Sequence, residues 1–291
     1  MTRPAALSRG AAFPKPRIGF GGISLILFMS LATASWVFIL SDKDSGFASF
    51  FQAETWAGAV AFLTRFLGVN GAEPPAYLRL ERWADMAGPA YETLAMSVLA
   101  ASIVGIGVML TFMPAARNVA MGELSASHSF GSRVLFFLIR GIYIFVRGVP
   151  ELVWAMLIIF FLSPGVLPGA VALGLHNFGI VGKLSAEVVE NLDSRPARAL
   201  RAAGASQLQM LAYAILPMAL PGFLTYLLYR WEVIIRTTIV VGFVGAGGLG
   251  REFRLSMSWF QYTDVALLLA VYLLLVIFVD LCSAWMRKLA R

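Results

Sequence analysis

The chain has 291 residues, of which 59% are hydrophobic and only 13% are charged, and its mean hydropathy is +0.79. A soluble domain carries about 25% charged residues, so this composition excludes an ordinary soluble protein and indicates a surface that faces lipid. The net charge of +7 suits either nucleic acid or the cytoplasmic loops of a membrane protein, and the distribution of lysine and arginine decides between them.

The first predicted span is Ile18–Leu40, which is uncharged and long enough to cross about 30 Å of hydrocarbon. It follows a basic segment, residues 1–17, that contains no acidic residue. A cleaved signal peptide is the alternative, because Ala32-Thr33-Ala34 resembles a cleavage site. Since the apolar run continues past this site, we expect an uncleaved first helix.

Residues 41–90 carry charges of both signs, and we expect them to form an outside loop. Within this loop, Thr55–Leu67 has the pattern of an amphipathic helix that lies on the membrane surface. The second predicted span is Tyr91–Met113, which Pro114 closes.

The third membrane segment is interrupted. Val134–Val146 is too short to span alone and is interrupted by Arg140, so we expect it to lie at the cytoplasmic interface or to enter the bilayer steeply. Leu152–Leu162 continues into the membrane, and a chargeless Ser-Pro-Gly turn follows at 163–165.

Three more spans complete the pattern: Val166–Val189, Met218–Val244 and Thr263–Met286. The first of them carries Lys183 and Glu187 one helical turn apart, and we expect these two residues to pair.

The loops differ in charge. The basic segments, predicted to lie inside, are 1–17, 114–133, 191–217 and 287–291. The segments predicted to lie outside are 41–90, 163–170 and 246–262, which taken together are neutral or acidic. The positive-inside rule then places both termini in the cytoplasm, with about six helices between them. The excess positive charge therefore faces a membrane leaflet and not a nucleic acid.

The inside segment 191–217 has the signals of two short helices joined at a bend, here called the elbow. Asp193 or Ser194 can cap the first helix, and Pro196 suits its first turn. Gly204 suits a left-handed helix end, and Ser206 begins a capping-box pattern for the second helix.

We expect the second helix of the elbow to end at Leu216-Pro217, where the chain re-enters the membrane. Small residues at a capped bend suit docking into a groove on a partner, although an ordinary ordered loop fits these helix signals equally well.

The elbow resembles the signature loop of the permeases of binding-protein-dependent ABC importers, which has Glu-Ala-Ala, then a glycine, then Leu-Pro. The matching residues are Ala199, Gly204, Leu216 and Pro217. The sequence departs from the family at Arg198, which stands in place of the acid, and at Ala214, which stands in place of an isoleucine. The loss of the acid removes one expected contact to the ATPase.

From about residue 90 to the end, the chain resembles the phosphonate/phosphite branch of these permeases. The blocks that carry this resemblance are Pro150–Ala155, Gly182–Leu184 with Ala186-Glu187, Leu228–Glu232 and Gly242–Gly250. The resemblance implies an all-α type I permease fold in 91–291, preceded by a tail, first span and outer loop in 1–90.

It also implies a homodimer in the bacterial inner membrane with two ATP-binding subunits, an outer solute-binding protein, and no cofactor. The residues expected to couple to the ATPase are Arg198, Ala199, Ala203, Gly204, Ala205 and Ser206. Phosphonate or phosphite is the substrate class that the resemblance implies, and another branch, such as a methionine-type importer, is the alternative. A membrane-embedded enzyme or a stand-alone channel fits less well, because histidines are scarce and the elbow would be unexplained.

Charged residues inside predicted spans are costly, at about 2.5–3.5 kcal/mol each on insertion scales, and should face a cavity or one another. Glu232 and Arg236 are one turn apart and can form a structural ion pair. In the functional alternative, such residues line the path of an anion. The pathway candidates are Glu151, Arg230, Glu232, Arg236, Thr237 and Thr238.

Several motifs are set aside. The run 245–250 fits the dinucleotide pattern G-x-G-x-x-G, but it follows a membrane span and lacks a βαβ unit, so we expect close helix packing or a flexible break. Gly182-Lys183 lacks the serine or threonine of a P-loop. No metal site is expected at His128 or His176, and Cys282 is expected to be a packing residue.

Overall fold

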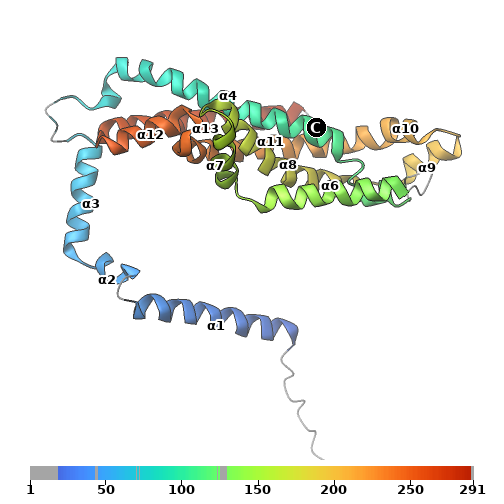
Figure 1. Ribbon diagram of the computed structural model, residues 1–291, viewed down its shortest axis with the longest axis horizontal. Coiled ribbons are helices and arrows are strands. Elements are labelled where there is room, and N and C mark those ends of the chain that lie inside the picture. The colour runs from blue at the N-terminus through green and yellow to red at the C-terminus, as the bar shows by residue number, and fades with distance from the viewer. Residues whose placement is uncertain are drawn as a thin grey trace, which may run out of the picture. The chain divides into compact units, whose positions relative to one another are not determined.

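The computed structural model of the chain describes residues 19–42, 45–69, 71, 73–122, 124 and 130–289. Within these ranges every regular element is helical and no strand occurs, which confirms the all-α class (Figure 1). The main helices are α1 (Phe20–Ser41), α3 (Ala53–Phe66), α4 (Leu80–Thr111), α6 (Phe130–Gly148), α7 (Glu151–Phe161), α8 (Val166–Glu190), α11 (Leu216–Val241), α12 (Gly248–Ser258) and α13 (Tyr262–Leu289). The short elements are α2 (Phe47–Phe50), η2 (Ala76–Leu78), α5 (Arg117–Ala120), α9 (Arg195–Ala202), α10 (Gln207–Met210), η3 (Leu211–Ile215) and η4 (Gly242–Ala246).

The chain forms two compact units, Met1–Leu63 and Thr64–Arg291. In the first unit, α1 has 22 residues and none of them is buried, so its apolar side chains are available to lipid. At 1.5 Å per residue, α1 is about 33 Å long, which confirms the first predicted span. The basic segment 1–17 lies outside the described residues. The predicted amphipathic helix is α3, and its position on the membrane surface stays a prediction.

The second predicted span begins earlier than expected. We assigned 41–90 to a loop, but α4 starts at Leu80 and continues through Pro89. Its charged first turns are held by other parts of the unit: Arg82 lies 3.8 Å from Asp264 of α13, and Trp83 donates to the carbonyl of Tyr77 at 2.9 Å. Charged residues therefore extend the helix beyond its apolar part, and the expected boundary at residue 90 falls inside α4.

The interrupted segment is a pair of helices, α6 and α7, that meet at an angle of 95°. Pro150 lies at the break and has no N–H to continue the hydrogen bonds of α6. Because α6 packs along α8, as Figure 1 shows, the steep entry into the bilayer is favoured over a position at the interface.

Among the described residues, four helical stretches are long and apolar enough to cross a membrane, or five if the bent pair is one span. The remaining predicted span, Val166–Val189, is α8, whose 25 residues are long enough but less apolar. The reason is its position: α8 packs against α4, α6, α7 and α11, so many of its residues face protein. Polar residues and glycines are tolerated there.

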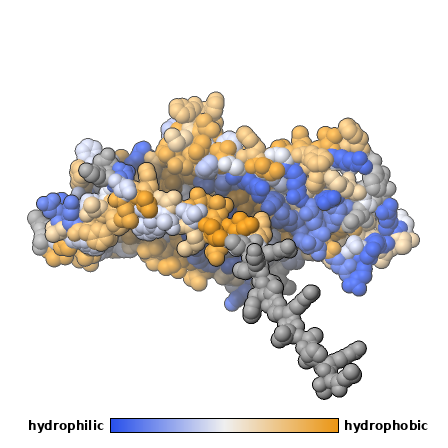
Figure 2. Space-filling model, turned by 90° about the horizontal axis from the view of Figure 1, so that it is seen from below, coloured by the Kyte–Doolittle hydropathy of each residue, from blue (hydrophilic) through white to orange (hydrophobic). Residues whose placement is uncertain are grey.

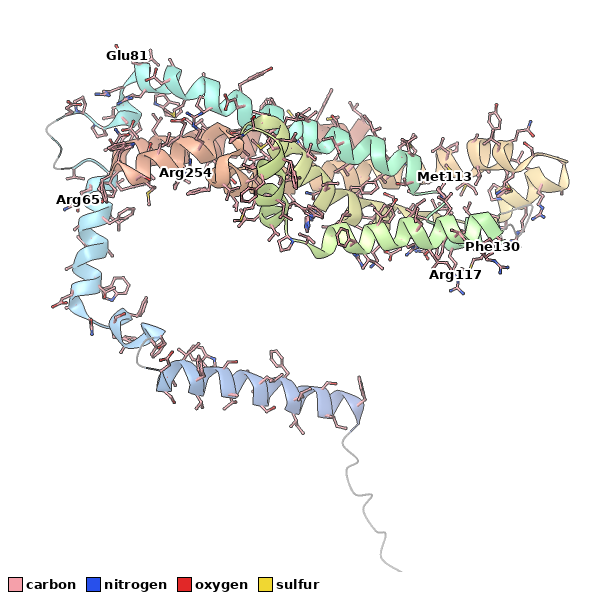
Figure 3. The ribbon with its side chains drawn as sticks, viewed as in Figure 1. Arg65, Glu81, Met113, Arg117, Phe130 and Arg254 are labelled. Carbon is pink, nitrogen blue, oxygen red and sulfur yellow. The ribbon has the colours of Figure 1, made fainter. Side chains whose placement is uncertain are left out.

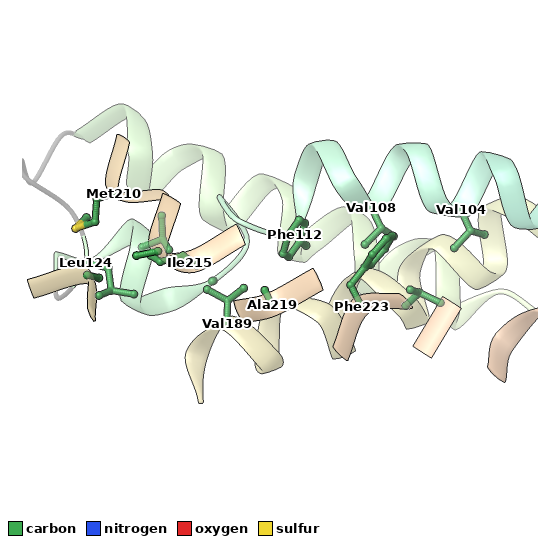
Figure 4. Packing of buried hydrophobic residues seen from close by; sticks show 14 residues of the cluster. Val104, Val108, Phe112, Leu124, Val189, Met210, Ile215, Ala219 and Phe223 are labelled. Carbon is green, nitrogen blue, oxygen red and sulfur yellow. The ribbon is translucent and has the colours of Figure 1, made fainter. Parts of the chain in front are cut away.

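Small residues allow the close packing of α8. A side chain at Gly179 would bring its Cβ within 2.5 Å of the carbonyl oxygen of Tyr143 on α6. Toward one end of the unit, α4 and α11 enclose a buried apolar cluster in which the rings of Phe112 and Phe223 stack with centroids 5.9 Å apart (Figure 4). This packing joins α4, α8 and α11 into one bundle.

The helix predicted to end at Leu216-Pro217 does not end there. Residues Gln207–Ala246 form a single helical stretch that runs through α10, η3 and α11. The expectation was wrong because the turn before the proline, Leu211–Ile215, is a π-helix. The altered hydrogen-bond pattern accommodates Pro217, whose missing N–H would interrupt a regular α-helix.

Candidate functional site

The elbow has the two helices and the bend that its sequence predicts. Gly204 has a φ of +85°, in the left-handed region that favours glycine. Its N–H donates to the carbonyl of Arg201 at 3.0 Å, and the N–H of Ala205 donates to that of Leu200 at 3.0 Å. These two bonds form a Schellman motif, which satisfies the last carbonyls of α9.

Both ends of the bend are capped. Ser206 accepts the N–H of Gln209 at 3.4 Å, and the N–H of Ser206 donates to the Gln209 side chain at 2.8 Å, so the predicted capping box is present. At the start of α9, Asp193 accepts the backbone N–H of Arg195 at 2.9 Å, whereas the side chain of Ser194 makes no capping bond. Of the two predicted caps, the structure uses Asp193.

The backbone N–H of Arg195 and then its guanidinium lower the pKa of the Asp193 carboxyl. The carboxylate is therefore charged at neutral pH. Its negative charge stabilises α9, because the helix dipole is positive at the N-terminus.

The elbow presents one face to the bundle and another to the exterior. Ala197 and Met210 are buried in the cluster of α4, α8 and α11. The predicted coupling residues Arg198, Ala199, Ala203, Gly204 and Ser206 are exposed, and Ala205 is half-buried. Figure 2 shows hydrophilic residues gathered toward the end of the unit that carries α9 and α10.

Two large apolar side chains on this surface were not predicted. Leu208 is 78% exposed and Tyr213 is 76% exposed, one on α10 and the other in η3. Exposed large apolar groups beside polar ones are typical of protein interaction sites. The capping box could have predicted the exposure of Leu208, because it places Leu208 in the first turn of a helix whose Met210 side is buried.

The base of the elbow is fixed by Glu190, the last residue of α8. Its carboxylate accepts the backbone N–H of Arg117 at 2.7 Å and forms an ion pair with Arg140 of α6. Asn118 donates to the carbonyl of Val189 at 2.8 Å. Figure 3 places Met113, Arg117 and Phe130 together at this end of the unit. These bonds tie the base of the elbow to α5, α6 and α8.

A second polar site lies inside the bundle, halfway along α8. Arg230 of α11 donates from Nε to the Oδ1 atom of Asn177, 2.5 Å away, and Asn177 is buried. His176 lies 3.2 Å from Glu151 through Nε2, and its Nδ1 lies 2.9 Å from the carbonyl oxygen of Val149. These residues join α11, α8 and the break between α6 and α7.

The structure divides the predicted pathway residues into two groups. Glu151 and Arg230 are brought to α8, where His176 and Asn177 complete what we call the central polar cluster. No metal site was expected at His176, and neither it nor Asn177 was placed on the pathway. The sequence pattern that could have identified His176 and Asn177 is a pair of adjacent polar residues in the middle of an apolar run.

The predicted pair between Glu232 and Arg236 is wrong. Glu232 pairs with Arg287 of α13 at 2.5 Å, and Arg236 pairs with Asp280 of α13 at 2.6 Å. Four residues apart, Glu232 and Arg236 lie about 40° apart around α11, so both face α13. The cross-helix partners lie closer than the neighbour on the same helix. Lys183 and Glu187 on α8 do pair, at 3.3 Å, as predicted.

The two threonines beside Arg236 bond to their own helix. Thr237 donates to the carbonyl of Ile234 at 3.1 Å, and Thr238 donates to that of Ile235 at 2.6 Å. Since Arg230 lies about 160° from Glu232 around the helix, only Arg230 of this charged set turns toward α8. Of the predicted pathway residues, Glu151 and Arg230 are therefore the two that contact polar side chains of α8.

The glycine run after α11 is closely packed, which is one of the two arrangements expected for it. A Cβ at Gly242 would stand 2.7 Å from the Cα of Gly250, and Gly247 has a φ of +86°. The N-terminus of α12 is occupied by side chains of α4: the N–H of Gly248 donates to Glu92 at 2.8 Å and that of Leu249 donates to Thr93 at 2.9 Å. Protein groups thus occupy the position that phosphates would take in a dinucleotide site.

Residues 118–290 match the family of binding-protein-dependent transport system inner membrane components. The chain belongs to this family. It is therefore a multi-pass inner-membrane permease, as its elbow and helices indicate. Cys282 is a free, partly exposed cysteine in α13, and no group of metal-binding side chains occurs among the described residues of this permease.

The relatives of the permease are transport proteins. It is 38% identical over 217 residues to the phosphite transport system permease protein PtxC of Stutzerimonas stutzeri, covering 75% of this chain and 74% of that one. It is 32% identical over 231 residues to the phosphate-import permease protein PhnE of Mycolicibacterium smegmatis, covering 79% of this chain and 40% of that one. The permease is accordingly a transport subunit and not an enzyme.

Solved structures agree on the fold. The permease superposes on a chain of the inward-facing MetNI methionine ABC transporter with a TM-score of 0.61 and 18% identity, covering 73% of this chain and 99% of that one. It superposes on an amino acid ABC transporter with a TM-score of 0.58 and 18% identity, covering 73% and 97% of the two chains. The permease has the helical fold of ABC importer subunits.

Proposed function

We propose that this permease carries phosphite- or phosphonate-like oxyanions into the cytoplasm by ATP-driven alternating access. The observation that carries this proposal is the 38% identity with a phosphite permease over three quarters of the chain. The central polar cluster supports it, because Arg230 brings a positive charge to the middle of α8, where it donates to Asn177. A permeating anion needs such a group where the bilayer offers no water.

In this proposal, two copies of the permease enclose the pathway, and two ATP-binding subunits dock on the cytoplasmic face. The exposed face of α9 and α10 supports docking at Arg198, Ala199, Ala203, Gly204, Ala205 and Ser206, with Leu208 and Tyr213 as apolar contacts. An outer solute-binding protein delivers the anion, and both termini lie in the cytoplasm.

Closure of the ATP-binding subunits would push the elbow, and the rigid base at Glu190 would pass this movement to α6 and α8. The same two helices carry or border the central polar cluster, through His176 and the break at Val149. The proposed cycle thus connects the elbow to Arg230 through contacts within one bundle.

The test is uptake by the complete transporter in proteoliposomes, with phosphite, methylphosphonate, phosphate and methionine offered separately. We expect uptake of the phosphorus oxyanions and none of methionine. Arg230→Gln should lower oxyanion uptake by about tenfold or more, because the loss of one charged hydrogen-bond donor costs that much in binding. Arg230→Lys should retain more.

Lys183→Gln is the matched control, since it removes one positive charge from the neighbouring helix at a residue that pairs with Glu187. Equal losses of oxyanion uptake in Lys183→Gln and Arg230→Gln would show that uptake depends on the total positive charge and not on Arg230 in particular. Uptake of methionine without phosphite would overturn the proposed substrate class.

A further inference from the structure

A polar cavity of about 480 Å³ lies where the turn between α7 and α8 meets the glycine break before α12. We call it the α12 vestibule. Its lining residues are Glu92, Pro164, Gly165, Val166, Val244, Gly245, Gly247, Arg251 and Arg254. It is separate from the central polar cluster, with which it shares no residue.

Two arginines of one helix face line this vestibule. Arg251 and Arg254 are three residues apart on α12, so they lie on the same side of the helix. Arg254 donates from Nη1 to the carbonyl of Phe243 at 3.0 Å, which holds its guanidinium over the glycine break. Within the described chain, Arg251 reaches a carboxylate only at 4.0 Å, between its Nε and Oε1 of Glu252.

Each guanidinium has five N–H donors, so most of the donors of both arginines remain for a ligand. Planar guanidinium groups match the oxygens of phosphorus oxyanions in pairs, which makes arginine the preferred side chain for them.

The carboxylate in the vestibule is already engaged. Glu92 accepts the N–H of Gly248 at 2.8 Å, at the N-terminus of α12. The lining therefore carries two positive charges and one negative charge, a net charge of +1. At Gly247 the wall of the vestibule is bare backbone. A Cβ at this position would stand 3.2 Å from the Oε2 atom of Glu92.

The position suits entry. Figure 3 places Arg254 near one end of the second unit, with Glu81, and places Met113, Arg117 and Phe130 near the opposite end. The opposite end carries the elbow (Figure 1). Since the elbow is cytoplasmic in the proposed orientation, the vestibule lies at the outer end of the permease. Its volume admits a small oxyanion with several of its waters, each of which occupies about 30 Å³.

We propose that the α12 vestibule binds a phosphorus oxyanion through Arg251 and Arg254 before the anion reaches Arg230. This inference rests on the proposed function and adds to it a second, outer binding site. The same chemistry would also attract the phosphate of a lipid headgroup, and the experiment separates the two sources.

The first arm measures phosphite uptake by the complete transporter in proteoliposomes. Arg251→Gln and Arg254→Gln should each raise KM for phosphite about tenfold, with little change in the rate at saturation, and Arg254→Lys should raise it less. Glu92→Gln should lower KM, because glutamine still accepts the Gly248 N–H while one negative charge is removed.

Arg65→Gln is the matched control. Arg65 lies over the ring of Tyr262, 5.9 Å from its centroid, and does not line the vestibule. The KM of Arg65→Gln for phosphite should therefore equal that of the wild type. An unchanged KM in the double variant Arg251→Gln/Arg254→Gln would overturn the inference, as would equal changes of KM in Arg65→Gln.

The second arm needs no transport. Val244→Cys in a Cys282→Ser background places a single thiol in the vestibule, and a negatively charged thiol reagent reports its access. Phosphite should slow labelling at least severalfold in phosphatidylcholine liposomes, and less once Arg251 is replaced by glutamine. Absence of protection by phosphite would contradict the vestibule.

Protection by phosphatidylglycerol liposomes, with no further effect of phosphite, would assign the site to lipid and overturn the proposal. If the wild type takes up no phosphite but phosphite still protects Val244→Cys, the proposed function fails while the vestibule stands. If the wild type takes up phosphite and the arginine variants keep the KM of the wild type, the proposed function stands while the vestibule proposal fails.

Discussion

Arg236 of α11 donates a hydrogen bond to the carboxylate of Asp280 on α13, with Nη2 and Oδ2 2.6 Å apart. The hydroxyl of Tyr272, also on α13, donates to the backbone carbonyl of Arg236 at 3.0 Å. A second pair, Arg287 with Glu232, joins the same two helices. Opposite charges thus contribute to the packing of α11 on α13, in a part of the chain where an unpaired charge is costly.

We expect Arg236→Gln and Asp280→Asn each to lower the midpoint of thermal unfolding in detergent, because each leaves one charge without its partner. The double variant should recover part of the loss, with a coupling energy of about 0.5–3 kcal/mol. The control is Glu232→Gln combined with Arg236→Gln, which should show no recovery since the two residues have different partners. Strict additivity of Arg236→Gln and Asp280→Asn would contradict the pairing.

Gly204→Val should abolish binding of the ATP-binding subunit while insertion into the membrane is retained. A Cβ at Gly204 would have no atom within 4 Å, so the cost comes from the backbone, at about 1–2 kcal/mol for a left-handed residue and more for a branched one. Gly204→Asn should retain binding, because asparagine tolerates this conformation. Pull-down of the ATP-binding subunit measures the effect.

Gly141→Ala is the control for this series, since Gly141 also faces open space but lies within helix α6. Arg198→Ala should weaken binding less than Gly204→Val if the shape of the backbone dominates the joint. Full binding by Gly204→Val would show that the elbow is not the coupling element.

The N-terminus of α9 should be stable at neutral pH and should loosen only in acid. The lowered pKa of Asp193 means that its contribution is complete above the ordinary value of 3.8 and is lost as the pH falls through the lower, folded value. Asp193→Ala should increase hydrogen exchange in α9 at neutral pH, after correction for intrinsic rates. Ser194→Ala should not, because the Ser194 side chain makes no capping bond. Equal effects would refute this assignment.

Reporter fusions will determine the number of spans. With α8 as a sixth span, cytoplasmic reporters should be active near Arg201 and after the C-terminus, and inactive near Glu73. With only five spans, counting the bent pair once and leaving out α8, the two termini would lie on opposite sides. With Glu73 outside, five spans would leave the reporters inactive both near Arg201 and after the C-terminus, because α11 and α13 separate these two sites in either case. That result would contradict six spans.

The sequence alone determined the features that depend on local chemistry. Apolar length predicted the spans, because a helix must cross a fixed thickness of hydrocarbon. Gly204 and Ser206 predicted the bend and the capping box, since both motifs are closed by residues within a few positions of each other. The run 245–250 predicted close helix packing or a flexible break, because it follows a membrane span and lacks a βαβ unit.

Only the tertiary structure decided which side chains meet across helices. Arg236 has Glu232 one turn away, but it pairs with Asp280, 44 residues further along the chain. Asn177 meets Arg230 for the same reason: packing of α8 on α11 sets the distance between them. Sequence spacing gives the direction of a side chain around its own helix, whereas the partner depends on how neighbouring helices are positioned and rotated. The central polar cluster and the α12 vestibule could therefore be located only once the helices were packed.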